Sequence, residues 1–348
     1  MLDFELLKKI SETPGAPGFE KLIRDLVKNE IRDLVDDMFI DSMGSLIGVR
    51  KGKDSKRVMV AAHMDEISFI VTHIDDDGFI RFHPLGGFDP KTLTAQRVIV
   101  HGKEDVPGVM GSKPIHLMSN DEKNKIAQIR DYFIDLGMKG EAVKELVSVG
   151  DPITRERELV VMGDCVNGKS LDNRVSVYIL IETLKALKGK ELPYDFYAAF
   201  TVQEEVGLRG AMNAAGHIDP DFGIGLDTTI AYDTPGAMPF EMVTQLGKGT
   251  GIKILDGSII CDSRMIAFLK SAAKKHNIAY QAEILPAGGT DTGAIQRQGA
   301  KGSIAGAISI PVRHIHQSIE MAHMGDISAT IDLLTVTVLE LDQWEWEL

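Results

Sequence analysis

The sequence predicts an α/β fold, in which a mostly parallel sheet is flanked by helices and a small β-rich barrel domain is inserted. Apolar strand-like runs alternate with amphipathic helical segments, which is typical of parallel βαβ units. Region 71–161 instead has short β-type runs between glycines, which indicate a small barrel or sandwich. The chain has 348 residues, 44% of them hydrophobic, which is enough for two domains with buried cores.

The elements of the predicted α/β part follow from the spacing of apolar residues. Residues 3–11 and 19–35 read as amphipathic helices on either side of a turn rich in proline and glycine. The further predicted strands are 38–40, 46–49, 58–62, 196–202, 222–227 and 303–310, and the further predicted helices are 173–187, 262–276 and 325–341. Because strands and helices alternate, helices are expected on both faces of the sheet.

The β-rich region divides the α/β domain into two stretches of sequence. We expect an inserted domain at 71–161 and an α/β domain made of 1–70 and 162–348. Within the insertion, the segment 124–137 is predicted to be helical.

Charge and cysteine content exclude several kinds of partner and site. The net charge of −13 and the pI of about 5.3 argue against nucleic acid or an anionic membrane as the main partner. Cys165 and Cys261, the two cysteines, cannot form a disulfide framework or a Cys-rich zinc site. The N-terminal residues lack a signal-peptide pattern, and no apolar run is long enough to span a bilayer. The expected location is the cytoplasm.

The stretch from Val58 to Ile70 carries the first chemical signal. Its apolar strand is followed directly by His63, Asp65 and Glu66, which suggests a buried strand whose end places these side chains in a cleft. An imidazole beside a carboxylate suits a zinc-type metal, either as two ligands or as one ligand with its orienting partner. The structural alternative is a strand-end histidine bonded to a neighbouring carboxylate.

Further metal-type ligands follow other predicted strands. These are Glu204 and Glu205 after 196–202, Asp227 at the end of 222–227, and His316 after 303–310, with Asp172 at the start of a helix. Singly, they could be a solvated pair, a turn residue or a helix N-cap. Together they share the carboxyl edge of the sheet, where ligands bind in open α/β folds. Two histidines and several carboxylates suit two metal ions bridged by a carboxylate, and one adjacent glutamate could accept a proton from the bridging water.

Five motifs in order, AHMDEISFIV, GKSLDNR, TVQEEVGLRGA, GLDTT and IPVRHIH, together with the loop AGGTDTGA (287–294), carry a family resemblance. The chain resembles the TET-type dinuclear metalloaminopeptidases, the glutamyl aminopeptidase and FrvX-like family, over essentially its whole length. The resemblance implies a phosphorylase/hydrolase-like catalytic domain that removes N-terminal residues from short peptides with two divalent ions, zinc or cobalt. It places His63 and Asp227 on one ion, Glu205 and His316 on the other, and Asp172 between them. Glu204 would be the general base, and Asp65 would orient His63.

The resemblance also implies features beyond the ligand set. The β-rich insertion would mediate dimer formation, dimers would assemble into a tetrahedral dodecamer, and the peptide bond after Asp172 would be cis. Ser68 stands where the family usually has glycine. His314 stands where an aromatic residue usually precedes the ligand, so either His314 or His316 could bind metal; motif spacing favours His316. The preferred N-terminal residue and the native metal stay open.

Parts of the sequence also fit other functions. Gly163–Ser170 matches the phosphate-binding pattern GxxxxGK[ST], but a nucleotide site would leave the histidines and glutamates without a role. Glu204 and Asp227 alone could serve a carboxylate-pair glycosidase, which needs no histidines. A related dimetal deacylase or carboxypeptidase is harder to separate by sequence. A peptide-binding scaffold with a degenerate site is disfavoured because no candidate ligand is missing.

Overall fold

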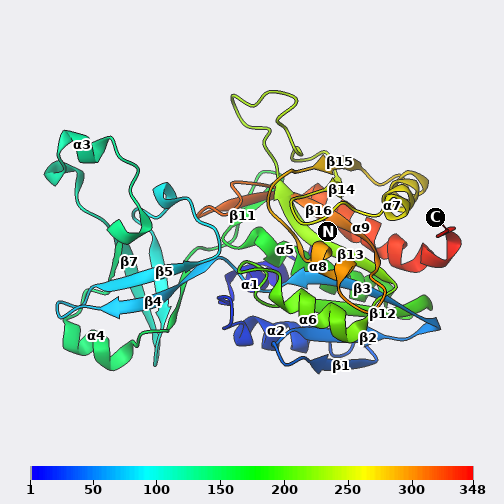
Figure 1. The fold of residues 1–348 in the computed structure, drawn as a ribbon, viewed down its shortest axis with the longest axis horizontal. Coiled ribbons are helices and arrows are strands. Elements are labelled where there is room, and N and C mark those ends of the chain that lie inside the picture. The colour runs from blue at the N-terminus through cyan, green and yellow to red at the C-terminus, as the bar shows by residue number, and fades with distance from the viewer. Residues whose placement is uncertain (1, 348) are drawn as a thin grey trace.

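Within residues 2–347, the part of the chain described by this computed structural model, eleven strands form a mixed sheet and six form a closed barrel (Figure 1). The nine strands along the main path of the sheet are, in spatial order, β1 (Asp37–Ile40), β2 (Leu46–Arg50), β12 (Leu192–Thr201), β3 (Gly52–His63), β13 (Phe222–Ile230), β16 (Ile304–Arg313), β17 (Glu320–His323), β11 (Cys165–Gly168) and β10 (Val160–Met162). Two more, β14 (Thr250–Leu255) and β15 (Tyr280–Ile284), extend the sheet beside β16.

Parallel pairing is confined mainly to the centre of this sheet. Strand β3 pairs in parallel with β12 and β13, and β13 pairs in parallel with β16. The outer pairs β1–β2, β2–β12, β16–β17, β17–β11 and β11–β10 are antiparallel. The apolar run at the end of β3 is fully buried, as expected for a central strand covered on both faces. The predicted α/β architecture is therefore confirmed, with a sheet that is mixed as a whole.

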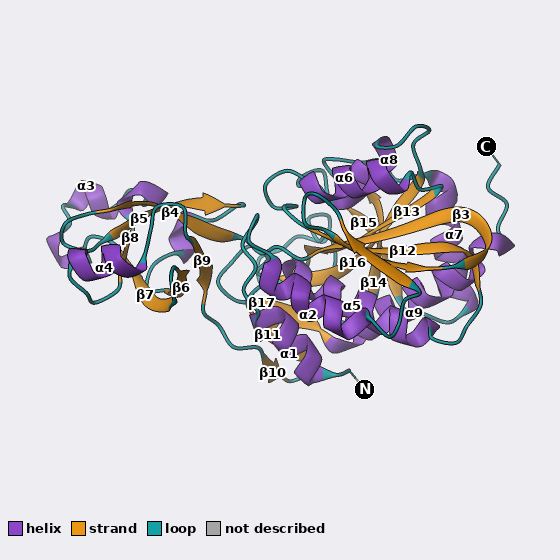
Figure 2. Cartoon of the chain, turned by 90° about the horizontal axis from the view of Figure 1, so that it is seen from below, coloured by secondary structure: helices purple, strands orange, loops and turns teal. Residues whose placement is uncertain are grey.

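Helices cover both faces of the sheet (Figure 2). Those that share the main apolar core are α1 (Phe4–Glu12), α2 (Lys21–Ile31), α5 (Leu171–Leu187), α7 (Ser263–Lys275) and α9 (Met324–Glu340). The opposite face carries α6 (Arg209–Ile218) and α8 (Asp291–Arg297), which contact each other. Helix α5 is buried along most of its length because it lies between the sheet and helices α1, α2 and α9. Among the described helices, none is long and apolar enough to cross a membrane.

The second body is a barrel built from one continuous stretch of chain. Its strands are β4 (Ser68–Ile74), β5 (Ile80–Leu85), β6 (Arg97–His101), β7 (Asp105–Gly111), β8 (Phe133–Asp135) and β9 (Pro152–Arg155). Alternate residues of β7 are buried, and Met110 belongs to a separate apolar core that includes Phe69 and Ile134. This core explains how the insertion can form a body of its own beside the α/β domain.

The predicted helix at 124–137 is wrong. The chain there has a short α3 (Asn120–Lys123), a 3₁₀ turn and strand β8, followed by an unpredicted helix α4 (Gly140–Leu146). Strand β8 pairs with β5 and β7 and so completes the barrel. Apolar residues in this segment satisfy helical spacing as well as strand alternation, and the long-range pairing decides between them.

Candidate active site

Strand register brings two of the predicted ligands, His63 and Asp227, to the same level of the sheet. His63 is the last residue of β3, and the parallel register pairs it with Thr201 of β12. Gly225 pairs with Ala61, which places Asp227 level with His63 on the next strand. Strand β13 continues to Ile230, so Asp227 lies within a strand and not at its end. The pairing of the strands alone is therefore enough to bring these side chains close together.

The carboxylate of Asp172 lies between two imidazoles. Its Oδ1 is 3.4 Å from Nε2 of His63, and its Oδ2 is 3.1 Å from Nε2 of His316. Asp172 comes from the first turn of α5, whereas His316 comes from the turn between β16 and β17. The peptide bond between Asp172 and Asn173 is cis, as the resemblance implied.

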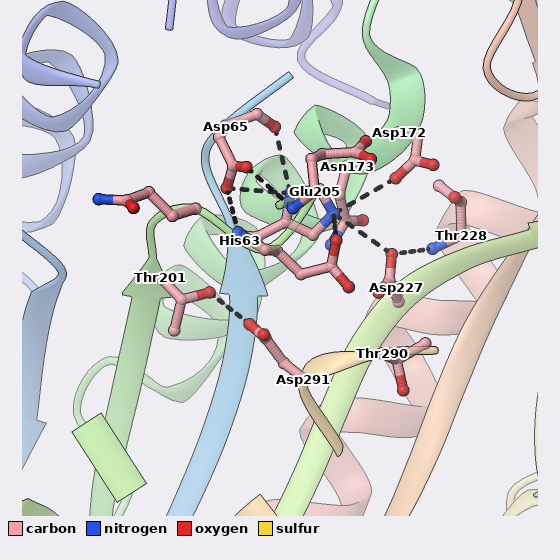
Figure 3. A network of polar contacts seen from close by, with 12 residues as sticks. His63, Asp65, Asp172, Asn173, Thr201, Glu205, Asp227, Thr228, Thr290 and Asp291 are labelled. Carbon is pink, nitrogen blue, oxygen red and sulfur yellow. Dashed lines mark hydrogen bonds and ion pairs between the residues drawn. The ribbon is translucent and has the colours of Figure 1, made fainter. Parts of the chain in front are cut away.

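Two sets of possible ligands share Asp172. One set is His63, Asp172 and Asp227, and the other is Asp172, Glu205 and His316; the ligand atoms of each set lie within 4.8 Å of one another. Figure 3 shows His63, Asp172 and Asp227 directed toward one another from separate elements. Nε2 of His316 is 3.4 Å from Oε1 of Glu205, an oxygen that accepts no hydrogen bond within the described chain.

Asp65 lies behind this cluster and is fully buried. Its two carboxylate oxygens accept hydrogen bonds from the backbone amides of Glu204 (3.0 Å) and Glu205 (3.1 Å). Nδ1 of His63 faces the same residue, so Asp65 contacts three members of the cluster. One carboxylate thereby fixes the turn after β12 against the end of β3.

The charges in the cluster are poorly compensated by the protein alone. Burial raises the pKa of the Glu204 and Asp227 carboxyls well above their usual range. Burial would lower the pKa of His316, but the Glu205 and Asp172 carboxylates beside it raise that pKa to about 12. Buried carboxylates therefore outnumber the imidazoles that could balance them, and divalent cations would remove this repulsion.

The residues present fit two divalent cations. Imidazole nitrogens and carboxylate oxygens are ligands for zinc and related metals. Oε1 of Glu205 has no hydrogen-bond partner among residues 2–347 and is free to bind an ion, and the carboxylate of Asp172 belongs to both ligand sets. Two neighbouring ions that share a carboxylate need such ligands.

The two histidines left open by the sequence differ in the structure. His316 belongs to the set with Asp172 and Glu205. His314 is exposed and belongs to none of the candidate sets found among the described residues. This geometry supports His316 as the ligand.

The phosphate-binding pattern forms a different structure. Its residues form the turn between β10 and β11, strand β11 and the two residues before α5, and not a glycine-rich loop leading from a strand into a helix. The buried ammonium of Lys169 donates to both carboxylate oxygens of Glu66, at 2.7 Å each. Lys169 is therefore committed to a buried ion pair and cannot serve a nucleotide phosphate.

A cavity of about 510 Å³ opens from the ligand cluster. Its walls include Thr229, Lys253, Asp256, Leu285 and the loop 287–290. Lys253, whose buried ammonium contacts Glu283, is not among the residues predicted from the sequence. A lysine inside the apolar run of β14 was the available signal, since buried lysines are rarely unpaired.

Imidazoles and carboxylates gathered at the carboxyl edge of a sheet, beside a cavity of this size, are typical of a metal-dependent hydrolase. Residues 44–333 match the model of the M42 glutamyl aminopeptidase family, and the chain belongs to that family. M42 aminopeptidases depend on metal ions. The predicted family and peptide hydrolase class are thus confirmed.

Relatives of similar length support the assignment. A putative aminopeptidase of Acetivibrio thermocellus is 42% identical, over 96% of this chain and 98% of the relative. The lysyl aminopeptidase of Pyrococcus furiosus is 35% identical, over 98% of each chain.

Solved structures show the same fold. A TET aminopeptidase from a marine sediment thaumarchaeon aligns with a TM-score of 0.94 and 37% identity, covering 97% of this chain and 96% of the other. PhTET1-12s, described as a dodecamer, aligns with a TM-score of 0.88 and 34% identity, covering 98% and 100%. A Thermotoga maritima protein described as an endoglucanase also aligns, with a TM-score of 0.79 and 30% identity, covering 96% of each chain.

Proposed function

We propose that the protein removes N-terminal residues from short peptides at a site for two divalent cations. His63 and Asp227 would hold one ion, Glu205 and His316 the other, and Asp172 would serve both. The observation that carries the proposal is the position of the Asp172 carboxylate, with one oxygen near each imidazole.

The bound ions would supply positive charge that polarises the scissile carbonyl and acidifies water. Glu204 would accept the proton, and two observations support this role: its Oε2 is 3.7 Å from Nε2 of His63, and its side chain borders the cavity. Burial raises the pKa of Glu204, which suits a group that takes a proton and returns it to the leaving amine. Asp65 would hold the backbone of this glutamate in place through the hydrogen bond from the Glu204 amide.

Zinc or cobalt is the proposed metal. Both ions accept imidazole and carboxylate ligands, and metal supply decides between such ions in cells. The cavity beside the site would take the side chain of the first residue.

The barrel is proposed as the dimerisation domain, with 71–161 as its expected limits and a tetrahedral dodecamer as the final assembly. Its separate core and closed sheet support a unit that can form contacts of its own. The similar PhTET1-12s chain is described as a dodecamer. Sedimentation velocity would test the assembly; a monomer at micromolar concentration would contradict it. Location in the cytoplasm stays a prediction.

Hydrolysis of an aminoacyl-p-nitroanilide panel tests the activity. We expect cleavage that is lost with EDTA and recovered with Zn²⁺ or Co²⁺, and an N-acetylated substrate of the same sequence should resist cleavage. Faster cleavage of N-acylated amino acids would indicate a deacylase, and release of C-terminal residues would indicate a carboxypeptidase. Polysaccharide hydrolysis that persists with EDTA would overturn the proposal in favour of a glycosidase.

A further inference from the structure

A second buried carboxylate contacts the backbone of two proposed ligands. Glu320, the first residue of β17, is fully buried. Its Oε2 accepts a hydrogen bond from the amide of Asp172 at 2.9 Å, and its Oε1 accepts one from the amide of His316 at 3.1 Å. This residue is not among those predicted from the sequence, because its neighbours form no recognised motif.

Neither amide can donate to an acceptor within a regular helix or strand. The Asp172 amide lies in the first turn of α5, where a helix has no internal acceptor for its N–H groups. His316 lies in the turn after β16 with φ of 58°, a left-handed conformation that is uncommon for residues with a side chain. Glu320 therefore supplies the link between these two segments.

The backbone of Glu320 is itself anchored. Strand β17 pairs with β11, where Glu320 lies opposite Gly168, and the Glu320 carbonyl accepts a hydrogen bond from Nδ2 of Asn167 at 2.9 Å. The side chain thus extends from a fixed strand toward two less constrained segments.

The barrel contributes the neighbouring positive charge. Arg155, the last residue of β9, is buried, and its Nη1 donates to the carbonyl of Gln317, the residue after His316. Its guanidinium also lies 5.6 Å from the centre of the Phe88 ring. A buried carboxylate beside Asp172 is costly without such compensation. The Glu320 side chain nevertheless offers two oxygen acceptors, one for each of the two amide donors.

We propose that Glu320 is a positioning residue that holds Asp172 and His316 in place for the ion between His316 and Glu205. This inference rests on the proposed two-ion site. Asp172 serves both sets, but His316 belongs only to the second set. His63 and Asp227 are fixed by strands β3 and β13, so the first ion depends less on Glu320.

Ion binding by the full-length protein tests the inference. Apoprotein is titrated with Co²⁺, whose visible absorption reports each bound ion, and ion content after dialysis is measured by elemental analysis. Wild-type protein should bind two ions. Glu320→Ala should weaken the second ion about 10–100-fold, the usual cost of removing a group that orients ligands, and leave the first nearly unchanged. Glu320→Gln keeps one oxygen acceptor but sets an amide N–H₂ against the other donor, so its loss should be smaller.

Asp326 provides a matched control. It is buried and its two oxygens accept from the amides of Gly247 and Gly249, at 2.7 Å each, outside the ligand sets. Asp326→Ala should lower thermal stability while both ions bind normally.

Each result distinguishes the inference from the proposed function. Absence of ion binding by wild-type protein would refute the two-ion site. Two ions in wild type and unchanged affinity in Glu320→Ala would refute the role of Glu320 alone. An equal loss of the second ion in Asp326→Ala would also refute it, since general destabilisation would then be the cause. If Glu320→Ala does not fold, unchanged affinity in Glu320→Gln overturns the inference, and a selectively weaker second ion supports it.

Discussion

Nδ1 of His63 lies 3.1 Å from the backbone carbonyl oxygen of Asp65 and 3.5 Å from its carboxylate. The closer acceptor for an Nδ1–H group is thus a main-chain atom, which any residue at position 65 would supply. The carboxylate instead accepts the amides of Glu204 and Glu205. This geometry favours an effect of Asp65 on the two glutamates more than on the histidine.

Asp65→Asn tests that distinction. The substitution leaves the carbonyl near His63 and replaces one of the two oxygen acceptors by an amide group. We expect kcat to fall about 10–100-fold, in keeping with the loss of an orienting contact, while the ion near His63 is retained. Loss of that ion in a Co²⁺ titration would show that the carboxylate acts mainly on His63.

Glu204→Gln should separate proton transfer from metal binding. The variant should retain both ions but lose about 10²–10⁴-fold in kcat, the usual contribution of a general base. Glu205→Gln is the matched control, because it changes the adjacent residue in the same way and should weaken the ion near His316. Wild-type turnover by Glu204→Gln would exclude Glu204 as the base.

Replacing His314 and His316 in turn should give opposite results. His316→Ala removes the Nε2 that lies 3.1 Å from Asp172 and should eliminate binding of one ion. His314→Ala changes an exposed side chain and should leave ion content unchanged. Elemental analysis of both dialysed variants checks this assignment, and the reverse pattern would make His314 the ligand.

Glu20→Gln should change how stability depends on pH. Burial and the nearby Asp65 charge raise the pKa of Glu20 from 4.5 to about 7. Between these pH values the unfolded chain has already lost a proton that the folded chain retains, so the free energy of unfolding falls as pH rises. The total fall is about 3 kcal/mol.

Glutamine should remove that fall without losing hydrogen bonds. A single oxygen, Oε1 of Glu20, accepts from both the Gly18 and Gln203 amides, and glutamine keeps such an oxygen. Urea denaturation at pH 5 to 8 with constant excess metal compares the two proteins. If the free energy of unfolding depended on pH equally in both proteins, the raised pKa of Glu20 would be contradicted.

Two Gly→Ala substitutions should have opposite signs. A Cβ at Gly225 would lie 1.8 Å from Oγ1 of Thr292, so Gly225→Ala should cost about 1–3 kcal/mol through overpacking. Gly216 is exposed in α6 and has no neighbour within 4 Å of such a Cβ, so Gly216→Ala should stabilise by roughly 0.5–1 kcal/mol. Thermal denaturation of both variants measures the difference, and stabilisation by Gly225→Ala would contradict the packing.

The spacing of apolar residues predicted a helix or strand correctly where the burial of that segment in the fold follows the same spacing. The apolar run ending at His63 and the helix that begins near Asp172 both lie in the main core, where burial and periodicity point to the same structure. The segment 124–137 failed because its apolar residues fit two periodicities, and pairing with β5 and β7 selected the strand.

Site residues could be predicted where they follow a strand or belong to a motif. Glu320 and Arg155 could not, because Glu320 reaches Asp172 and Arg155 reaches Gln317 across long stretches of sequence, and sequence spacing carries no trace of such contacts. Lys253 lies in an apolar run, but its partner Glu283 becomes its neighbour only through the pairing of β14 with β15.

The division of the α/β domain by the barrel has a consequence for the newly made chain. Strand β3 leaves the ribosome early, but its partners β12 and β13 follow only after the whole barrel, whose strands pair among themselves. The barrel can thus close before β12 and β13 are available to pair with β3. His316 follows the other five residues of the cluster in the sequence, so under the proposed assignment a partly synthesised chain would lack a ligand of the second ion. The order of synthesis would then keep nascent chains inactive until this part of the α/β domain is made.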